Sequence, residues 1–516
     1  MAVKDIHTHN AFAESVGAAR NQYKLNPLPA SVNQAKIDKE TYKRWFKYIQ
    51  DMGANTIRIY TVQQDVFYNA FYEYNKDNDN PLYLIHGVWV NDYTQNSHRD
   101  ALDKGFKERF LSDCRTMLDV IHGNKKIGLG RMASAGSGFY LHDVSQWIIG
   151  YILGVEWEDV TVAYTNEQYK DIKGAGCSGC CVFSWQDEWF KRTWNTMYAV
   201  NLKRTPYWSD YQTNEQYFGL ISFDPGSEQS VCYVDGDASE WTDDDIVADR
   251  GDMKLSMKYD EKFVYFMVKK DGLNIDKDKI YIPLDITPKS GSSYYEEKNM
   301  LFDRAVDFII ELEGKQNSRV RVQERYEVLR SNYSENVYEY NAYLKDNIPS
   351  KDSPRFTNID MILQTATPLI YNNLQAPAET FETGKLTYGN ANPSSKDFNS
   401  LADFMAGDGF VEIKLPWQLL NFSDPSLMTI HDDYYEHYGI EYIEVSEIWA
   451  GLSSNGSEPR RAELKPFKLK KWENTVTYHE RLKSSYYALQ KYWRNQDEDR
   501  DISLCLSRCM SGDDRI

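Results

Sequence analysis

The sequence predicts an α/β region built around a parallel sheet, followed by an antiparallel β-sandwich. In residues 37–224, helical and strand-like patterns alternate, and the strand-like segments are apolar throughout, which is typical of parallel strands buried on both faces. From about residue 231, short segments alternate apolar and polar residues with period two, which indicates antiparallel strands. At 516 residues the chain exceeds one hydrophobic core, so we expect two or three domains.

The elements of the first region follow from residue spacing. Tyr42, Trp45, Phe46 and Ile49 recur at helical intervals, and Gly53 then ends the helix. The same reasoning predicts helices at residues 41–52, 66–74 and 104–121, and strands at residues 55–60, 82–90 and 147–158.

Polar and aromatic side chains lie at or just after the ends of these strands. The carboxyl ends of the strands of a β/α barrel face one common site. This favours a barrel over a doubly wound fold, whose glycine-rich phosphate-binding turn we do not find in a convincing context. The candidate substrate-binding or catalytic residues are Arg58, His86, Trp89, Glu156, Glu158, Trp185, Asp187, Glu188 and Trp189.

Residues 182–196 set acids beside three tryptophans at the end of an apolar run. An indole ring covers the apolar face of a sugar ring, while carboxylates and amides bind the sugar hydroxyls. The pattern therefore points to carbohydrate. The alternative is that these tryptophans belong to a hydrophobic core, because most aromatic residues in a large chain are structural.

Composition narrows the classes of partner. A net charge of −18 argues against a nucleic-acid or anionic-membrane surface, which requires concentrated lysine and arginine. A neutral oligo- or polysaccharide is more compatible with this negative net charge. No apolar run reaches the length of a membrane span, and residues 1–10 do not resemble a signal peptide, so we expect a soluble chain, cytoplasmic as written. The sequence gives no oligomeric state.

The second region reads as a sandwich with long insertions. Residues 332–399 are rich in Asn, Ser, Pro and Tyr and are expected to form loops. A helix is predicted over 478–493, followed by a disordered tail. The expected sandwich strands include residues 263–268, 280–284, 306–312 and 410–415, and the expected domains are residues 1–226, 227–475 and 476–516.

Several segments of the first region resemble the catalytic barrel of family 2 glycoside hydrolases, within the large clan of retaining (β/α)8 glycosidases. Bacterial proteins of this type are sometimes labelled family 2 glycosyltransferases. The resemblance covers most of residues 37–225 and implies a carbohydrate substrate. It would also allow a location in the cell envelope or outside the cell. The segments that carry it are residues 45–46, 53–60, 81–89, 154–158 and 185–190.

The second region resembles the sandwich of family 9 carbohydrate-binding modules and DOMON domains, through residues 234–241, 259–265, 284–288 and 412–417. Trp241 and Trp417 are the candidate sugar platforms, although both motifs also suit core packing. No cofactor is expected, and no metal site is assigned. Asp235, Asp237 and Asp260 could offer oxygens to calcium in this region, because calcium prefers carboxylate ligands, but their spacing matches no EF-hand loop.

The retaining mechanism needs two carboxylates, about 5 to 5.5 Å apart, as acid/base and nucleophile. The resemblance places the acid/base after the fourth strand, which makes Glu158 the candidate and Glu156 the reserve. The alternative is that one of them pairs with Arg58. Only 15 residues separate Glu158 from Gly174, whereas each strand-and-helix step needs roughly 30. We therefore expect an incomplete barrel that lacks strands five to seven and the nucleophile.

Two functional hypotheses remain from the sequence. The chain is either a glycoside hydrolase-like protein with weak or lost activity, or a non-catalytic glycan-binding or structural protein. A residual site would pair Glu158 with Asp187 or Glu188. A truncated gene is a third alternative.

Overall fold

The chain divides into two compact units, and neither unit is one continuous segment. Unit 1 comprises Met1–Phe190, Glu215–Asp224 and Glu480–Ile516, and unit 2 comprises Lys191–Asn214 and Pro225–His479. The computed structural model describes residues 3–7, 38–59, 61–88, 104–128, 136–153, 179–183, 185–186, 204, 207–208, 219–225, 230–327, 348–364, 367–368, 375–376, 379–431, 433–437, 442–454, 460–475 and 478–495.

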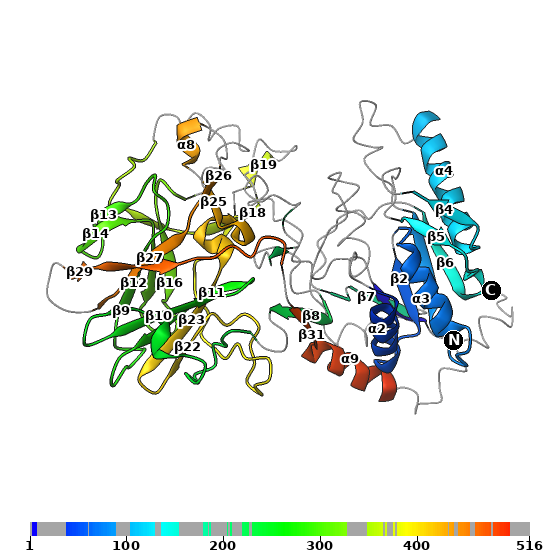
Figure 1. Ribbon diagram of the computed structural model, residues 1–516, viewed down its shortest axis with the longest axis horizontal. Helices are drawn as coiled ribbons and strands as arrows, with labels where there is room; N and C mark the ends of the chain where they lie inside the picture. Colours follow the sequence, from blue (N-terminus) through cyan, green and yellow to red (C-terminus); the bar gives the residue numbers. More distant parts are fainter. Residues whose placement is uncertain are drawn as a thin grey trace. The chain divides into compact units, whose positions relative to one another are not determined.

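Unit 1 contains a five-stranded sheet in the order β6-β3-β2-β1-β7, in which every neighbouring pair is parallel (Figure 1). Helices α2, α3 and α4 belong to the same unit. Among the described residues this sheet is open, and no closed barrel is found. The bounds are β1 Val3–His7, α2 Lys39–Asp51, β2 Thr56–Ile59, α3 Asp65–Asn75, β3 Tyr83–Val88, α4 Lys104–Ile121, β6 Ile148–Leu153 and β7 Gly179–Phe183, with a small hairpin of β4 Lys125–Ile127 and β5 Gly138–Tyr140.

Helix α2 shows how the sequence positions this layer. The Asp38 carboxylate caps the helix by accepting the N–H of Thr41. Gly53, with φ of +98°, follows the helix in a conformation that favours glycine. Between these ends, Phe46 is fully buried and packs edge-on against Phe67 of α3, with ring centroids 5.6 Å apart. The helical stripe predicted from spacing is therefore the face that α2 turns to α3.

The end of the chain returns to unit 1. Strand β31 (Tyr478–Leu482) pairs with β8 (Ile221–Pro225), and helix α9 (Ser484–Asn495) follows. The Tyr486 hydroxyl donates to the Tyr48 carbonyl of α2 over 2.7 Å, and Trp493 is fully buried. The prediction of one helix over 478–493 was thus wrong for its first five residues, which form a strand. The disordered tail was predicted from Arg494, but Arg494 and Asn495 are the last residues of α9, and the rest of the tail lies outside the described residues.

Unit 2 is built on two antiparallel sheets. One has the order β22-β23-β11-β10-β9, and the other has the order β17-β16-β15-β12-β27-β30, with β28 also paired to β12. The bounds are β9 Ile246–Asp249, β10 Lys254–Tyr259, β11 Phe263–Lys269, β12 Ile280–Asp285, β15 Phe308–Leu312, β16 Arg319–Gln323, β17 Phe356–Asn358, β22 Phe404–Gly407, β23 Phe410–Pro416, β27 Glu447–Gly451, β28 Ser453–Ser454 and β30 Leu464–Lys468.

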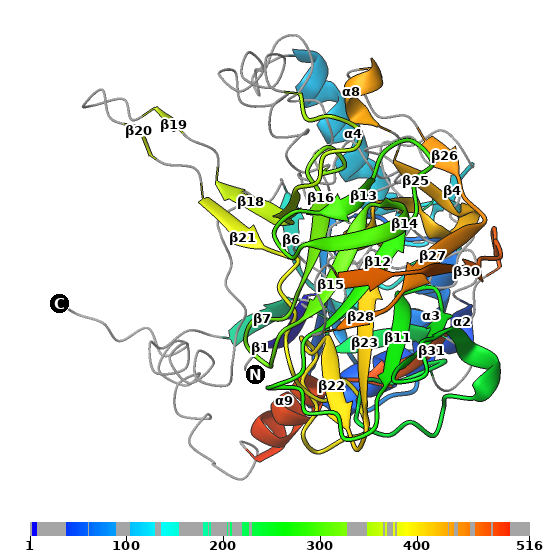
Figure 2. The same ribbon diagram turned by 90° about the vertical axis from the view of Figure 1, so that its left-hand side faces the viewer.

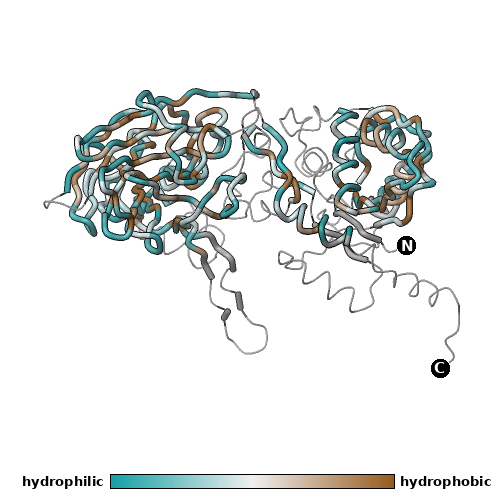
Figure 3. The backbone as a smooth tube through the Cα atoms, turned by 90° about the horizontal axis from the view of Figure 1, so that it is seen from below, coloured by the Kyte–Doolittle hydropathy of each residue, from teal (hydrophilic) through white to brown (hydrophobic). Residues whose placement is uncertain are grey.

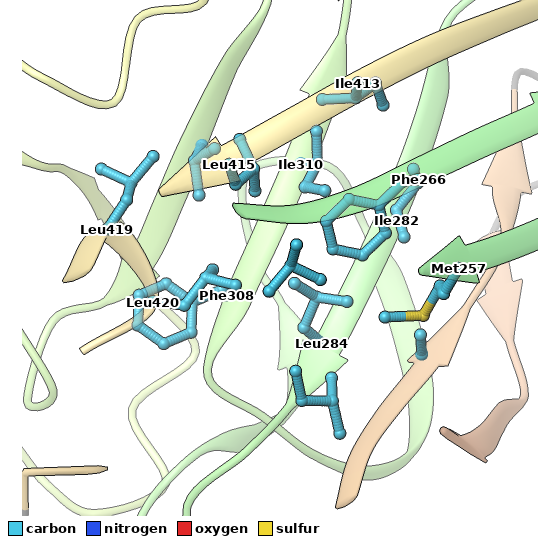
Figure 4. Packing of buried hydrophobic residues seen from close by; sticks show 14 of the residues in the cluster. Met257, Phe266, Ile282, Leu284, Phe308, Ile310, Ile413, Leu415, Leu419 and Leu420 are labelled. Carbon is cyan, nitrogen blue, oxygen red and sulfur yellow. The ribbon is translucent and has the colours of Figure 1, made fainter. Parts of the chain in front are cut away.

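The two sheets share one hydrophobic core. Phe266 and Ile413 from the first sheet belong to the same buried cluster as Ile282, Phe308 and Ile310 from the second, and all five are fully buried (Figure 4). Successive side chains of a strand point to opposite faces, so one face of each sheet meets this core. In unit 2, hydrophilic stretches lie mostly at the outside and hydrophobic ones inside (Figure 3). The two antiparallel sheets therefore pack against one shared core.

Smaller elements are added to these two sheets. A three-stranded sheet of β13, β14 and β29 lies over a second apolar cluster on the outer side of the β12 sheet, and the hairpins β18–β21 and β19–β20 project from unit 2 (Figure 2). The bounds are β13 Ser292–Tyr295, β14 Met300–Val306, β18 Asp360–Gln364, β19 Thr367–Pro368, β20 Gln375–Ala376, β21 Glu379–Glu382, β24 Phe422–Asp424, β25 Thr429–His431, α8 Tyr434–His437, β26 Tyr442–Glu444 and β29 Arg460–Ala462.

The coarse fold class is confirmed, because a parallel α/β part is joined to a β-rich part with several antiparallel sheets. Strand β1 was not predicted. Its five residues, Val-Lys-Asp-Ile-His, are too few and too polar to carry a strand signal. No helix among the described residues is both long and apolar enough to cross a membrane.

Candidate functional site

The residues predicted to form a site follow the strands of the parallel sheet. The motif of residues 53–60 contains β2, and that of residues 81–89 contains β3. Residues 154–158 come directly after β6, and residues 185–190 come two positions after β7. Because these four strands are parallel members of one sheet, their carboxyl ends lie along one edge of it. This edge is the candidate functional site.

Arg58 is the charged residue of β2, and it is half-buried. The strand register pairs Arg58 with Ile85 of β3 and with His7 of β1. Side chains that are in register on parallel neighbours share a face. Ile57 and Ile59, the neighbours of Arg58 along β2, are fully buried on the opposite face. Arg58 therefore lies on the face of the sheet opposite to that of Ile57 and Ile59.

His86 of β3 lies on that opposite face, in register with Ile59. Its Nε2 atom is 2.6 Å from the hydroxyl of Tyr68 on α3, and its Nδ1 atom is 3.0 Å from the Gly87 carbonyl oxygen. A carbonyl only accepts, so the hydrogen bonds assign the proton to Nδ1, and Nε2 accepts from the Tyr68 hydroxyl. The hydroxyl oxygen in turn accepts the Gln63 N–H over 3.2 Å. Both ring nitrogens of His86 are therefore in use.

This arrangement corrects the prediction that His86 binds substrate. The side chain is fully buried, and burial lowers the pKa of His86 to about 4, against the opposing effect of the Gly87 carbonyl. The neutral imidazole of His86, with both ring nitrogens hydrogen-bonded, joins β3 of the sheet to helix α3. The sequence placed His86 near the end of the right strand but could not show on which face it lies.

Trp185 is also a structural residue. It is fully buried, and its carbonyl accepts the N–H groups of Leu220 and Ile221 over 2.9 and 2.8 Å. Gln186 forms a parallel bridge to Ile221. The chain beyond β7 is thus held against the start of β8. The prediction of Trp185 as a sugar platform is corrected, because stacking requires an indole face that a ligand can reach.

The remaining candidates of this edge lie outside the described residues. They are Trp89, Glu156, Glu158, Asp187, Glu188 and Trp189. The acid/base and substrate-binding roles that the sequence gave them stay predictions.

In unit 2, Trp417 is a core residue. Its side chain is fully buried and lies edge-on to Tyr259 and Phe422, with ring centroids 5.7 and 4.7 Å away. Trp472 packs at 6.0 Å. The indole Nε1–H donates to the Asp260 carbonyl over 2.8 Å. The prediction of a sugar platform at Trp417 is therefore wrong, because protein covers the ring.

Trp241 is likewise enclosed, with 8% of its surface exposed. Its Nε1–H donates to Glu412 over 2.8 Å, and the Lys258 ammonium lies 5.5 Å from the ring centroid. The ring packs in a small cluster with Cys232 and Phe263. This second predicted platform is corrected for the same reason as Trp417.

Glu412 of β23 is the residue around which the segment 232–241 is arranged. One carboxylate oxygen accepts from Trp241 and lies 3.9 Å from the Cys232 sulfur, and the other accepts the N–H groups of Asp235 and Gly236 over 3.2 and 3.0 Å. Burial raises the pKa of Glu412 to about 7, while these donors act in the opposite direction. Sequence reasoning did not single out Glu412. The available signal was a lone acid between Val411 and Ile413 in an apolar strand.

The three acids considered for calcium are engaged in internal hydrogen bonds. The Asp260 carboxylate accepts two backbone N–H groups and the Tyr265 hydroxyl. The Asp235 carboxylate accepts the Asp237 N–H and the Asn392 amide, and the Asp237 carboxylate accepts the Ser239 N–H. Over the described ranges, no group of three or more His, Cys, Asp and Glu side chains has a metal-binding arrangement.

Comparison with known proteins gives no match for this chain among family models, curated proteins or solved structures.

Proposed function

We propose that this chain is a carbohydrate-active protein related to the retaining (β/α)8 glycosidases, that it binds oligo- or polysaccharide, and that its hydrolytic activity is weak or lost. One observation carries the proposal. Four of the five segments that carry the resemblance contain or follow strands of one parallel sheet: residues 53–60 and 81–89 contain β2 and β3, and residues 154–158 and 185–190 come after β6 and β7. A substrate site built on carboxyl strand ends requires this arrangement.

The strand order also fits a barrel that has lost its middle strands. Strand β1 lies between β2 and β7, the last strand of the parallel sheet. In a closed barrel, the first strand likewise lies between the second and the last. Between β6 and β7 the chain has 25 residues, 154–178, and three further strand-and-helix steps would need roughly 30 residues each. An incomplete barrel accounts for both features.

The chemistry follows from the missing strands. A retaining glycosidase needs a nucleophile opposite its acid/base, and the family's nucleophile belongs to a strand for which this chain has no room. General acid catalysis by Glu158 alone would contribute about 10² to 10⁴ in rate, without the covalent intermediate that divides the reaction into two easier steps. We therefore expect the chain to bind carbohydrate but to hydrolyse it weakly or not at all. Arg58, on the sheet face opposite the helix-contacting His86, is the described residue that we assign to the ligand.

The test is affinity electrophoresis of the full chain in gels that contain a panel of neutral polysaccharides. Wild-type protein should be retarded by at least one of them. Arg58→Gln should weaken that retardation about tenfold, the loss of a hydrogen bond made by a charged group. The matched control is Arg44→Gln, which removes an exposed arginine of α2 and should leave the affinity unchanged. Equal retardation of all three proteins would remove Arg58 from the site, and no retardation on any polysaccharide would contradict the proposed binding.

A further inference from the structure

One edge of the β12 sheet in unit 2 is interrupted by a hairpin. Strand β17 pairs with residues 321–323 of β16, and Lys385 forms an antiparallel bridge with Arg319 of the same strand. The Val320 N–H donates to the Gly384 carbonyl over 2.7 Å. Because β15 pairs along the other edge of β16, the chain leaves one edge after β17 and returns to that edge at Gly384.

The inserted hairpin is anchored at its base. The Ile359 carbonyl accepts the N–H groups of Thr383 and Gly384 over 2.9 and 3.2 Å, and Ile359 belongs to the core that the two sheets share. Beyond this base, β18 pairs with β21, and β19 pairs with β20. We call these four strands the arm.

The arm projects from unit 2 (Figure 2). In the part of the chain that the structure describes, its strands pair only with one another, and Phe381 of β21 is 58% exposed. A two-stranded ladder by itself is marginally stable in water. The arm would therefore be stabilised by a further strand.

The sequence of the arm offers such a strand an uncharged edge. Residues 361–378 contain no Asp, Glu, Lys or Arg, although 26% of the residues of the chain are charged. Proteins commonly protect an edge strand from pairing with another chain by placing charged side chains on it. From Met361 to Gln364, β18 lacks this protection.

A second copy of this chain fits that edge. A net charge of −18 opposes association between identical copies, and the repulsion is smallest where they meet through an uncharged segment. The backbone edge of a strand is also self-complementary. Across a two-fold axis, two identical strands run antiparallel and exchange N–H and carbonyl groups.

The two outer strands of the arm are not equivalent for this pairing. Strand β21 begins with Glu379 and ends with Glu382, so a two-fold pairing centred on it would set these acids opposite each other. Like charges directly opposite destabilise a ladder. Strand β18 has a single acid, Asp360, at the base of the arm. Charge therefore favours the edge of β18.

We propose that β18 pairs edge to edge with β18 of a second copy of this chain, antiparallel and across a two-fold axis. The pairing joins two two-stranded ladders into one four-stranded sheet. It is independent of the carbohydrate site proposed for unit 1. Because the contact is smaller than a standard interface of about 20 to 30 residues a side, the dimer should be weak, with a Kd of about 10⁻⁵ M.

The test is sedimentation-velocity ultracentrifugation of the full chain, at concentrations from about 1 to 100 µM that bracket the expected Kd. Wild-type protein should change from mostly monomer to mostly dimer over this range. A wild-type chain that sediments as a monomer at every concentration would overturn the proposal.

A matched pair of variants locates the contact. Ile362→Asp places a charge in the middle of β18, where the two-fold axis brings it close to its own copy, so the Kd should rise about tenfold. Thr380→Asp is the control. Thr380 is the residue of β21 that pairs with Ile362, so the same charge lies one strand away from the contact and the Kd should remain that of wild type. Equal weakening by both variants would contradict pairing through β18.

A deletion tests the arm as a whole. Asp360 and Glu382 are paired in the ladder, so Asn-Gly, a two-residue turn that joins paired strands, can replace residues 361–381. This variant keeps the base of the arm. It should melt at the wild-type temperature and sediment as a monomer at every concentration. A deletion variant that dimerises with the wild-type Kd would overturn the proposal, and if the deletion does not fold, the two point variants decide.

Discussion

Replacement of Trp417 tests whether the aromatic residues of unit 2 serve the core or a ligand. The indole is fully buried against Tyr259 and Phe422, and its Nε1–H is bonded to the Asp260 carbonyl at 2.8 Å. Truncation of a buried tryptophan to alanine typically costs about 3 to 5 kcal/mol. Loss of the hydrogen bond, with the carbonyl left in the interior, adds about 1 kcal/mol. We expect Trp417→Ala to lower the free energy of unfolding of unit 2 by about 4 to 6 kcal/mol.

The milder Trp417→Phe variant keeps most of the aromatic contact and loses the hydrogen bond. It should cost about 1 to 3 kcal/mol. Urea denaturation followed by tryptophan fluorescence measures both variants, and Phe381→Ala is the matched control, because Phe381 is 58% exposed and its truncation should change stability by no more than about 0.5 kcal/mol. If Trp417→Ala unfolded at the wild-type urea concentration but no longer bound polysaccharide, the assignment of Trp417 to the core would be refuted.

Two further predictions concern the contacts that hold each unit together. The pKa of His86 falls from 6.5 to about 4 on folding. Its contribution to the free energy of unfolding is therefore complete above pH 6.5 and is lost as the pH falls towards 4, by about 3 kcal/mol at most. Denaturation at several pH values should show this loss in wild type and not in His86→Gln. Arg204 bonds Asp424 and Asn474 through separate nitrogens, at 2.8 and 2.7 Å, and lysine cannot reproduce that fork. Arg204→Lys should therefore destabilise unit 2 by about 1 to 3 kcal/mol, measured as a shift of the urea midpoint, whereas a wild-type midpoint would show that the fork is not needed.

Elements with a strong local pattern were predictable from the sequence. Helix α4 has the predicted bounds, Lys104–Ile121, and α2 and α3 differ from prediction by a few terminal residues. Strands β11 and β23 also lie where period-two alternation placed them. In α2 and α3 the spacing of apolar residues marks the buried face, whereas in β11 and β23 successive residues are buried on both faces, so the alternation located these strands without showing their burial.

The roles of single side chains were not predictable in the same way. His86, Trp185 and Trp417 have the residue types of a carbohydrate site, but the fold places each of them inside a packed layer. Register and packing decide this, and neither is encoded in the few residues around each position. Asp307 gives the converse case. It stands between Val306 and Phe308 in an apolar run, which indicates burial, but only the meeting of β12, β14 and β16 shows that one of its carboxylate oxygens has no partner among the described residues.

The central claim is that this chain binds carbohydrate without efficient hydrolysis, and one paired measurement tests it. Full-length protein is incubated with a polysaccharide that retards it in affinity gels, and released reducing ends are followed for wild type and Glu158→Gln. The account predicts retained binding in both proteins and a turnover well below the range of about 1 to 10³ s⁻¹ that is typical of enzymes. Hydrolysis by wild type within that range, abolished in Glu158→Gln, would contradict it.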